Sequence, residues 1–276
     1  MAHCKVSTPD RCTAHQCGFR AAAVLKTVRR VSTAALLMHF LPGQTAEAGS
    51  PVKELSSSEA TSYIAAVLAS AEYKSFKRRL AQDYTGALQV QEERSSALKF
   101  QGYVCVVVPV LGGTGHSAYI AWFSKNSERI TTAGYALYTL DSEGNIVGQV
   151  AHDGKTVVDA TIKPSGEIVR GIVYNSDGTR TILQAGSFPI QKSVGTLAIS
   201  DPMCCITGCL SAMGIPAYII TFVAISCGLA CLIPGAAGLV ACVACVSWAL
   251  GAWLGLGLRC VYNCYACIEY NGCTAC

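Results

Sequence analysis

Charged residues are scarce in this 276-residue sequence, and its most apolar part contains none. No Asp, Glu, Lys or Arg occurs between Met203 and Leu258, although charged residues make up 14% of the whole chain. The formal net charge of +4 comes mainly from residues 1–48, which hold six basic and two acidic side chains. The rest of the sequence lacks the clusters of Lys and Arg that bind nucleic acid, so we expect no nucleic-acid partner.

Recognisable catalytic motifs are also missing. The glycine-rich stretch 112–117 (GGTGHS) lacks the Lys of a phosphate-binding loop, and we interpret it as a hairpin turn. His152, Asp153 and Asp159 have no nucleophile motif beside them, and we interpret His152 and Asp153 as part of a solvated turn. Cys105 lies in a Val-rich run and reads as a small buried apolar residue. We therefore predict that the protein is not an enzyme and needs no cofactor or metal.

The first 48 residues are typical of an export signal. An arginine pair at 29–30 precedes the mostly apolar run Val31–Leu41, and Ala46-Glu47-Ala48 then supplies the small residues that a signal peptidase accepts. We predict cleavage before Gly49 and a secreted product. The alternative is an amphipathic helix that stays in the mature protein, and the choice between Sec and twin-arginine export is open.

Residues 49–200 form the second predicted region, and it begins with helices. Strong helix formers run from Leu55 to about Lys99, and Ser56–Ser58 could cap the first helix. Apolar side chains recur at roughly helical intervals, at Tyr63, Val67, Leu68, Phe76 and Leu80. We expect one or two amphipathic helices in this stretch.

The period then changes to that of β-strands. Tyr103–Val110 and Ala118–Phe123 are rich in β-branched and aromatic residues. Beyond Thr131, turn dipeptides separate apolar stretches at intervals of 10 to 12 residues: Gly144-Asn145, Asp153-Gly154, Ser165-Gly166 and Asp177-Gly178. Such dipeptides between alternating apolar residues predict successive hairpins, so we expect an antiparallel meander of at least five strands.

The tail, Asp201–Cys276, is the third predicted region. It holds twelve of the sixteen cysteines: Cys204, Cys205, Cys209, Cys227, Cys231, Cys242, Cys245, Cys260, Cys264, Cys267, Cys273 and Cys276. That density is typical of a small secreted disulfide scaffold. Pro234-Gly235 separates two predicted helices, Ile215–Ile233 and Ala236–Leu258. The predicted fold class is therefore α+β, with N-terminal helices and a β-meander followed by a disulfide-rich helical hairpin.

Cysteine spacing suggests how the hairpin is cross-linked. Measured outward from Pro234-Gly235, Cys231 and Cys242 are nearly equidistant from the turn, as are Cys227 and Cys245, which predicts these two nested disulfides. At the open end the spacing predicts that one group of cysteines meets another: Cys204, Cys205 and Cys209 with Cys260, Cys264 and Cys267. Cys273 and Cys276 have no assigned partner.

Two other readings of the tail are open. Cys242-x2-Cys245-x18-Cys264-x2-Cys267 has the spacing of a four-thiolate zinc site. The uncharged run is also long enough for a two-pass membrane anchor.

The order of segments resembles the precursors of the halocin C family of archaeal microhalocins. Ile206-Thr207-Gly208-Cys209 looks like the opening of that peptide, and the apolar Pro-Gly middle and the terminal Cys276 are similar. The resemblance implies that a processing peptidase cuts between Ser200 and Asp201. It also implies that the tail acts on the membrane or envelope of competing cells and that Gly49–Ser200 is an immunity portion that sequesters it. The chain lacks the acidic excess of haloarchaeal proteins, so we expect a bacterial relative.

A second function from a different class is a membrane-anchored surface protein whose β domain has a structural or adhesive role. In that case the full-length chain would stay in the membrane fraction after removal of the signal.

Overall fold

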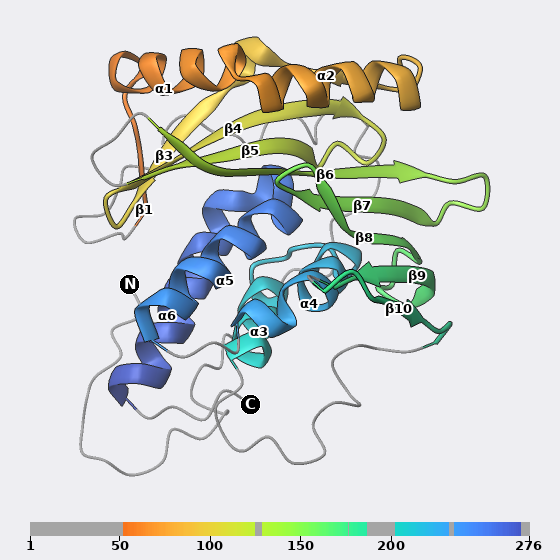
Figure 1. Ribbon diagram of the computed structural model, residues 1–276. Coiled ribbons are helices and arrows are strands. Elements are labelled where there is room, and N and C mark those ends of the chain that lie inside the picture. The colour runs from red at the N-terminus through yellow and green to blue at the C-terminus, as the bar shows by residue number, and fades with distance from the viewer. Residues whose placement is uncertain (1–51, 125–128, 176, 187–201, 232–234, 272–276) are drawn as a thin grey trace, which may run out of the picture.

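The chain folds into three layers, with the sheet in the middle (Figure 1). The computed structural model describes residues 52–124, 129–175, 177–186, 202–231 and 235–271. Helices α1 (Ser57–Ala69) and α2 (Ala71–Asp83) cover one face of the sheet. In the tail, α4 (Ala217–Cys231), α5 (Gly235–Leu250) and α6 (Leu254–Asn271) contact the other face, whereas α3 (Pro202–Ala212) packs mainly on α4 and α6. This architecture confirms the predicted α+β class.

Within these residues the sheet is antiparallel throughout and has ten strands in the order β1-β3-β4-β5-β6-β7-β8-β9-β10, with β2 pairing to β4. The strands are β1 (Val52–Glu54), β2 (Leu88–Val90), β3 (Ser96–Phe100), β4 (Tyr103–Gly112), β5 (Ser117–Phe123), β6 (Ile130–Leu140), β7 (Ile146–His152), β8 (Lys155–Ile162), β9 (Ile168–Tyr174) and β10 (Arg180–Leu183). The predicted meander corresponds to β6–β10. Its four turn dipeptides all lie in the connections between these strands, and 113–116 connects β4 to β5.

The central strands β4 and β5 are buried on both faces, which explains their nearly unbroken apolar sequence. Successive side chains point to opposite faces. Val106 and Phe123 therefore pack toward α1 and α2, whereas Cys105, Ile120 and Trp122 pack toward the tail. Cys105 is fully buried and free, as predicted.

Two short helices, α1 (Ser57–Ala69) and α2 (Ala71–Asp83), form the first helical layer. The backbone N–H of Ser56 donates to the Glu59 carboxylate (3.1 Å), one half of a capping box at the start of α1. The prediction of helix up to Lys99 was wrong beyond Asp83. Gly86, at φ +87°, turns the chain, and the residues of β3 then alternate between the two faces of the sheet.

The tail contains more than the predicted pair of helices. It forms α3 (Pro202–Ala212), α4 (Ala217–Cys231), α5 (Gly235–Leu250), the 3₁₀ turn η3 (Gly251–Trp253) and α6 (Leu254–Asn271). The predicted single helix Ala236–Leu258 is wrong because Gly251 interrupts it at φ +53°. A Cβ at Gly251 would lie 2.2 Å from the backbone oxygen of His116, so the close approach of the tail to the sheet requires glycine there.

The structure describes four disulfides in the tail. Cys227–Cys245 and Cys231–Cys242 join α4 to α5, and they are the nested pairs that the spacing predicts. Cys205–Cys264 and Cys209–Cys260 join α3 to α6. Cys204 is also disulfide-bonded.

These disulfides contradict the zinc reading. Three of the four proposed ligands, Cys242, Cys245 and Cys264, are disulfide-bonded and cannot act as thiolates. Among the described residues no group of His, Cys, Asp and Glu is placed to hold a metal ion. The remaining predicted sites lie outside the described part of the chain: the Cys267 side chain, Cys273, Cys276, the signal-cleavage residues Ala46, Ala48 and Gly49, and the processing residues Ser200 and Asp201.

Candidate functional site

The most extensive contact in the molecule that could carry a function is the surface between the sheet and the tail, called the sheet–tail interface below. Buried residues from both sides form one continuous hydrophobic core. Ile120, Trp122 and Tyr138 contribute from the sheet, and Phe222 and Leu250 contribute from the tail. The core continues through the helical layer to its disulfides, because Cys227, Cys231, Cys242, Cys260 and Cys264 belong to it.

Each aromatic side chain that the structure describes in the tail contacts a ring of the sheet portion. Tyr218 and Phe222 pack on Tyr138 at 6.1 and 5.0 Å between ring centroids. The remaining pairs are Trp253 with His116, which also contacts Tyr218, then Trp248 with His152 and Tyr262 with Phe100. The five tail residues, Tyr218, Phe222, Trp248, Trp253 and Tyr262, are called the aromatic face below.

Hydrogen bonds fix the position of the tail on the sheet. Trp122 Nε1 donates to Ser247 Oγ (2.9 Å), and the Tyr138 hydroxyl donates to the backbone oxygen of Ala249. At the β4–β5 turn, Trp253 Nε1 donates to His116 Nδ1 (2.9 Å). The Trp122 indole and the Tyr138 phenol are buried donors, whose burial is costly without a partner, and Trp253 is partly buried.

Two glycines in the strands lie close to aromatic rings of the tail. A Cβ at Gly148 would lie 2.1 Å from the ring of Phe222, and one at Gly134 would lie 2.9 Å from the ring of Trp248. A glycine inside a strand weakens the strand, and it often marks a place where another group approaches closely. At Gly148 the tail itself requires glycine, whereas a Cβ at Gly134 would first meet the backbone oxygen of Ala151 on β7 (2.4 Å).

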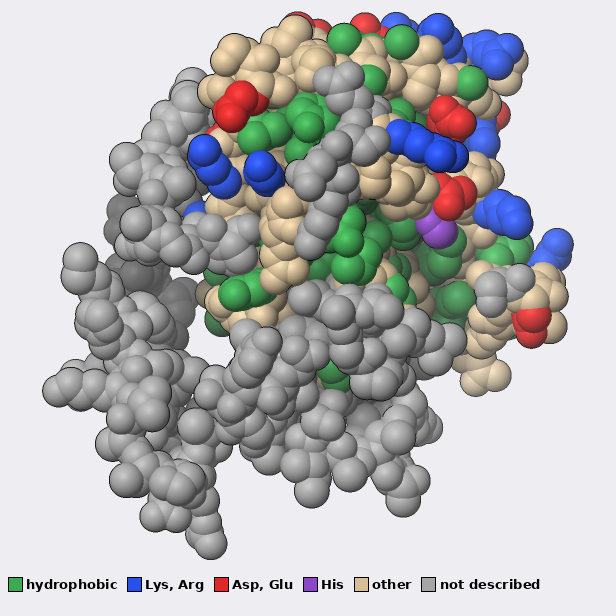
Figure 2. Space-filling model, turned by 60° about the vertical axis from the view of Figure 1, so that its left-hand side comes forward, with side chains coloured by type: hydrophobic (Ala, Val, Ile, Leu, Met, Phe, Trp, Pro, Cys, Tyr) green, Lys and Arg blue, Asp and Glu red, His purple; other side chains and the backbone are tan. Residues whose placement is uncertain are grey.

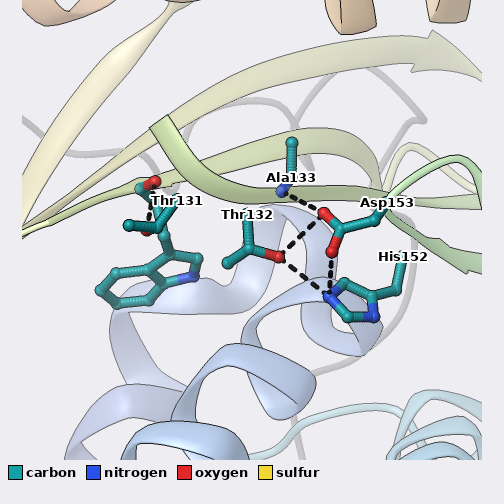
Figure 3. A network of polar contacts seen from close by, with 6 residues as sticks. Thr131, Thr132, Ala133, His152 and Asp153 are labelled. Carbon is teal, nitrogen blue, oxygen red and sulfur yellow. Dashed lines mark hydrogen bonds and ion pairs between the residues drawn. The ribbon is translucent and has the colours of Figure 1, made fainter. Parts of the chain in front are cut away.

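His152 lies in a polar cluster at one edge of the sheet–tail interface (Figure 3). Its Nε2 is 2.9 Å from Thr132 Oγ1 and 3.0 Å from Asp153 Oδ2. The His152 ring also stacks on Trp248 at 4.1 Å between ring centroids. Asp153 also accepts from Thr132 Oγ1 and from the backbone N–H of Ala133. His152 is therefore half-buried against the tail, which corrects the interpretation of His152 as part of a solvated turn.

This cluster does not have the geometry of a base relay. In a catalytic triad the carboxylate binds one imidazole nitrogen and the nucleophile binds the other. Here the hydroxyl of Thr132 and the carboxylate of Asp153 both contact Nε2 of His152. The arrangement orients the ring against Trp248 instead.

Burial lowers the pKa of both interface histidines below the ordinary value of 6.5. For His116 the cause is desolvation. For His152 desolvation outweighs the neighbouring Asp153 carboxylate, which acts in the opposite direction. The neutral imidazole is therefore the form that fits the interface, and in His116 it offers the lone pair that accepts from Trp253.

The interface is open beside His152. An apolar groove of about 540 Å³ runs between the sheet and the hairpin, lined by Val150, Val157, Ala230, Val240 and Ala244 among others. Figure 2 shows Lys, Arg, Asp and Glu side chains gathered over the upper part of the molecule, with hydrophobic side chains exposed below them. The tail thus leaves some apolar surface uncovered even in the folded chain.

The sequence identified the cysteines but not the residues that join the sheet to the tail. His116 and His152 were assigned to turns without a role, and Tyr138 and Ser247 carried no motif. Gly134 and Gly148, isolated within apolar strands, were the available signal of a close contact.

The tail also contains a segment with the length and composition of a membrane span, Val240–Cys264, with a mean hydropathy of 1.8. In its most apolar window, 61% of the residues are buried inside the protein. No protein-family model, curated protein or solved structure matches the chain.

Proposed function

We propose that this chain is the exported precursor of a disulfide-stabilised hydrophobic antimicrobial peptide. The peptide is the tail Asp201–Cys276, and Gly49–Ser200 is the immunity portion that sequesters it until a peptidase cuts near Ser200. The product acts on the envelope of competing cells. The proposal extends the resemblance of Ile206–Cys209 and of the precursor layout to halocin C precursors.

One observation carries the proposal: the described disulfides all close within the tail, whereas the contacts of the tail with the sheet are non-covalent. Each of the four described disulfides joins one tail helix to another. Cys105, the single cysteine of residues 49–200, is free. After a cut in the connecting segment, only non-covalent contacts would hold the two units together, and the tail would keep its own cross-links.

The sheet supplies what a precursor of such a peptide needs. A soluble protein rarely exposes apolar patches larger than a few hundred Å². The sheet covers the aromatic face and offers hydrogen-bond partners at His116, Trp122 and Tyr138. This cover supports a sequestering role for Gly49–Ser200.

Analysis of the culture supernatant tests the proposal. We expect mass spectrometry to find an oxidised peptide that starts near Asp201, and we expect it to inhibit the growth of a competitor strain. Added Gly49–Ser200 should suppress the inhibition. A matched control replaces Cys227, Cys231, Cys242 and Cys245 by Ala, which should remove the active peptide because the α4–α5 pair loses its cross-links.

The second candidate, a membrane-anchored surface protein, is favoured by the apolar segment Val240–Cys264. Its expected result is a full-length chain in the membrane fraction, starting at Gly49, with no released peptide. That outcome would reject the precursor.

A further inference from the structure

The tail has two different surfaces. Its described aromatic side chains all contact the sheet, and Tyr218, Phe222 and Trp248 are at most 8% exposed. Among the tail residues whose exposure the structure describes, those exposed to solvent are mostly small: Gly208, Ser211, Ala212, Met213, Gly214, Ala217, Val240 and Asn263. Separation from the sheet would therefore uncover these aromatic side chains.

We propose that the aromatic face is the surface with which the released tail binds a lipid bilayer, so that the sheet and the bilayer compete for the same side chains. This inference rests on the proposed function, because it needs the tail to leave the sheet. The partner is the lipid bilayer, and the uncut chain does not bind lipid through this face because the sheet covers it.

The chemistry of the face suits the boundary between water and hydrocarbon. Trp and Tyr have an apolar body with one polar group, and they concentrate at membrane interfaces. The indole N–H of Trp253 now donates to His116, and it could donate to lipid oxygens instead. No charged residue lies between Met203 and Leu258 that would have to be desolvated.

A lipid bilayer suits the aromatic face better than a protein receptor does. Charged and polar groups orient specific protein partners and suppress wrong ones. The aromatic face has four of its five residues in the uncharged stretch, and the fifth, Tyr262, follows Arg259 closely. Binding to this face therefore depends on apolar area and on single hydrogen-bond donors, which a bilayer accepts without a matching shape.

The disulfides keep the face assembled after separation. Phe222 and Tyr218 lie on α4 and Trp248 on α5, and two disulfides join these helices. α4 and α5 have 15 and 16 residues, so each is about 22 to 24 Å long at a rise of 1.5 Å per residue. That is shorter than a hydrocarbon core of about 30 Å. The geometry thus favours helices that lie along the interface with the aromatic face toward the lipid.

The test uses the chain 49–276 with a site-specific protease sequence in place of residues 192–197. Three versions each retain one tryptophan, Trp122, Trp248 or Trp253, with Phe at the other two positions. Vesicles of brominated phosphatidylcholine quench the fluorescence of a tryptophan that enters the bilayer. Circular dichroism and the mass of the oxidised chain show that each version is folded.

After the cut, we expect Trp248 and Trp253 to lose most of their emission in the presence of vesicles, while Trp122 keeps its emission. Before the cut, no version should be quenched. A fourth version carries Val240→Trp with Phe at the three native tryptophans, and it reports on the outer surface. Its quenching should be several-fold weaker than that of Trp248.

Three results would overturn the inference: equal quenching before and after the cut, equal quenching of the Val240→Trp reporter and Trp248, or cut halves that remain together and unquenched on vesicles. Growth inhibition separates the two proposals. Inhibition by the natural peptide without quenching rejects the bilayer contact and leaves the precursor intact. Quenching with neither natural release nor inhibition rejects the precursor alone.

Discussion

The two helical layers cover opposite faces of one sheet, but different forces stabilise them. α1 and α2 are amphipathic and begin at serine caps, and Lys77 of α2 forms an exposed ion pair with Glu92 in the connection between β2 and β3. α3–α6 have almost no charge and are joined to one another by disulfides. The first layer therefore depends on the sheet for the burial of its apolar side. The second has a covalent framework of its own, which is why only the tail is a candidate for release.

The largest expected difference between the layers comes from removing a disulfide. The double replacement Cys209→Ala with Cys260→Ala removes a disulfide between residues that are 51 positions apart. We expect this loss to lower the free energy of unfolding of the tail by about 2 to 4 kcal/mol. Hydrogen exchange should show faster opening of α3 and α6 and little change in α1 and α2. The control is Cys105→Ala, which removes a thiol without a cross-link. An equal loss of protection in both layers would contradict the comparison.

Gly148→Ala tests the contact between the sheet and the tail. The new methyl group would press on the Phe222 ring, and overpacking of this kind costs about 1 to 3 kcal/mol. Urea unfolding measures the loss. Gly208→Ala is the matched control, because that helix position is open and Ala should stabilise it by about 0.5 to 1 kcal/mol. A neutral Gly148→Ala would mean that Phe222 does not need this space.

Ser70→Ala probes the first layer alone. Ser70 Oγ accepts from the backbone N–H of Tyr73 at the start of α2 (3.1 Å), and loss of such a cap costs about 1 kcal/mol. Exchange should speed up in α2 and stay constant in the tail. Ser70→Asp, which restores an acceptor, should recover most of the protection.

The smallest expected effect is a pH dependence that concerns the tail layer only. His116 and His152 have lowered pKa values in the folded chain, so the unfolded chain binds more protons just below pH 6.5. Tail docking is therefore most stable above that pH and weakens as the pH falls toward the folded pKa. Tail exchange at about pH 7.5 and about pH 5 measures this change. The double variant His116→Asn with His152→Gln should reduce the difference in tail exchange between the two pH values. An unchanged difference would mean that other titratable groups cause the pH dependence.

Local signals made part of the structure predictable. Asp153-Gly154 and its counterparts mark hairpins because few residues adopt the backbone that tight turns need. The nested pairs Cys227–Cys245 and Cys231–Cys242 follow from helix periodicity on either side of one proline-glycine turn. Both features depend on residues that are close in sequence.

The sheet–tail interface could not be predicted from such local patterns. His116 and Trp253 meet across 137 positions, and no local pattern encodes that contact. The unbroken apolar run of β4 indicated burial on both faces but not which segments cover them. The break at Gly251 was missed for the same reason, since only the approach to His116 requires it.

We expect Cys105 to impose an order on oxidative folding. Its side chain points to the face of β4 that the tail covers, and burial raises the pKa of its thiol. A protonated, inaccessible thiol does not take part in thiol–disulfide exchange. Before the tail docks, the same thiol is one more partner for the tail cysteines. Chains oxidised too early would therefore accumulate mixed bridges to Cys105, and docking of the tail ends that competition.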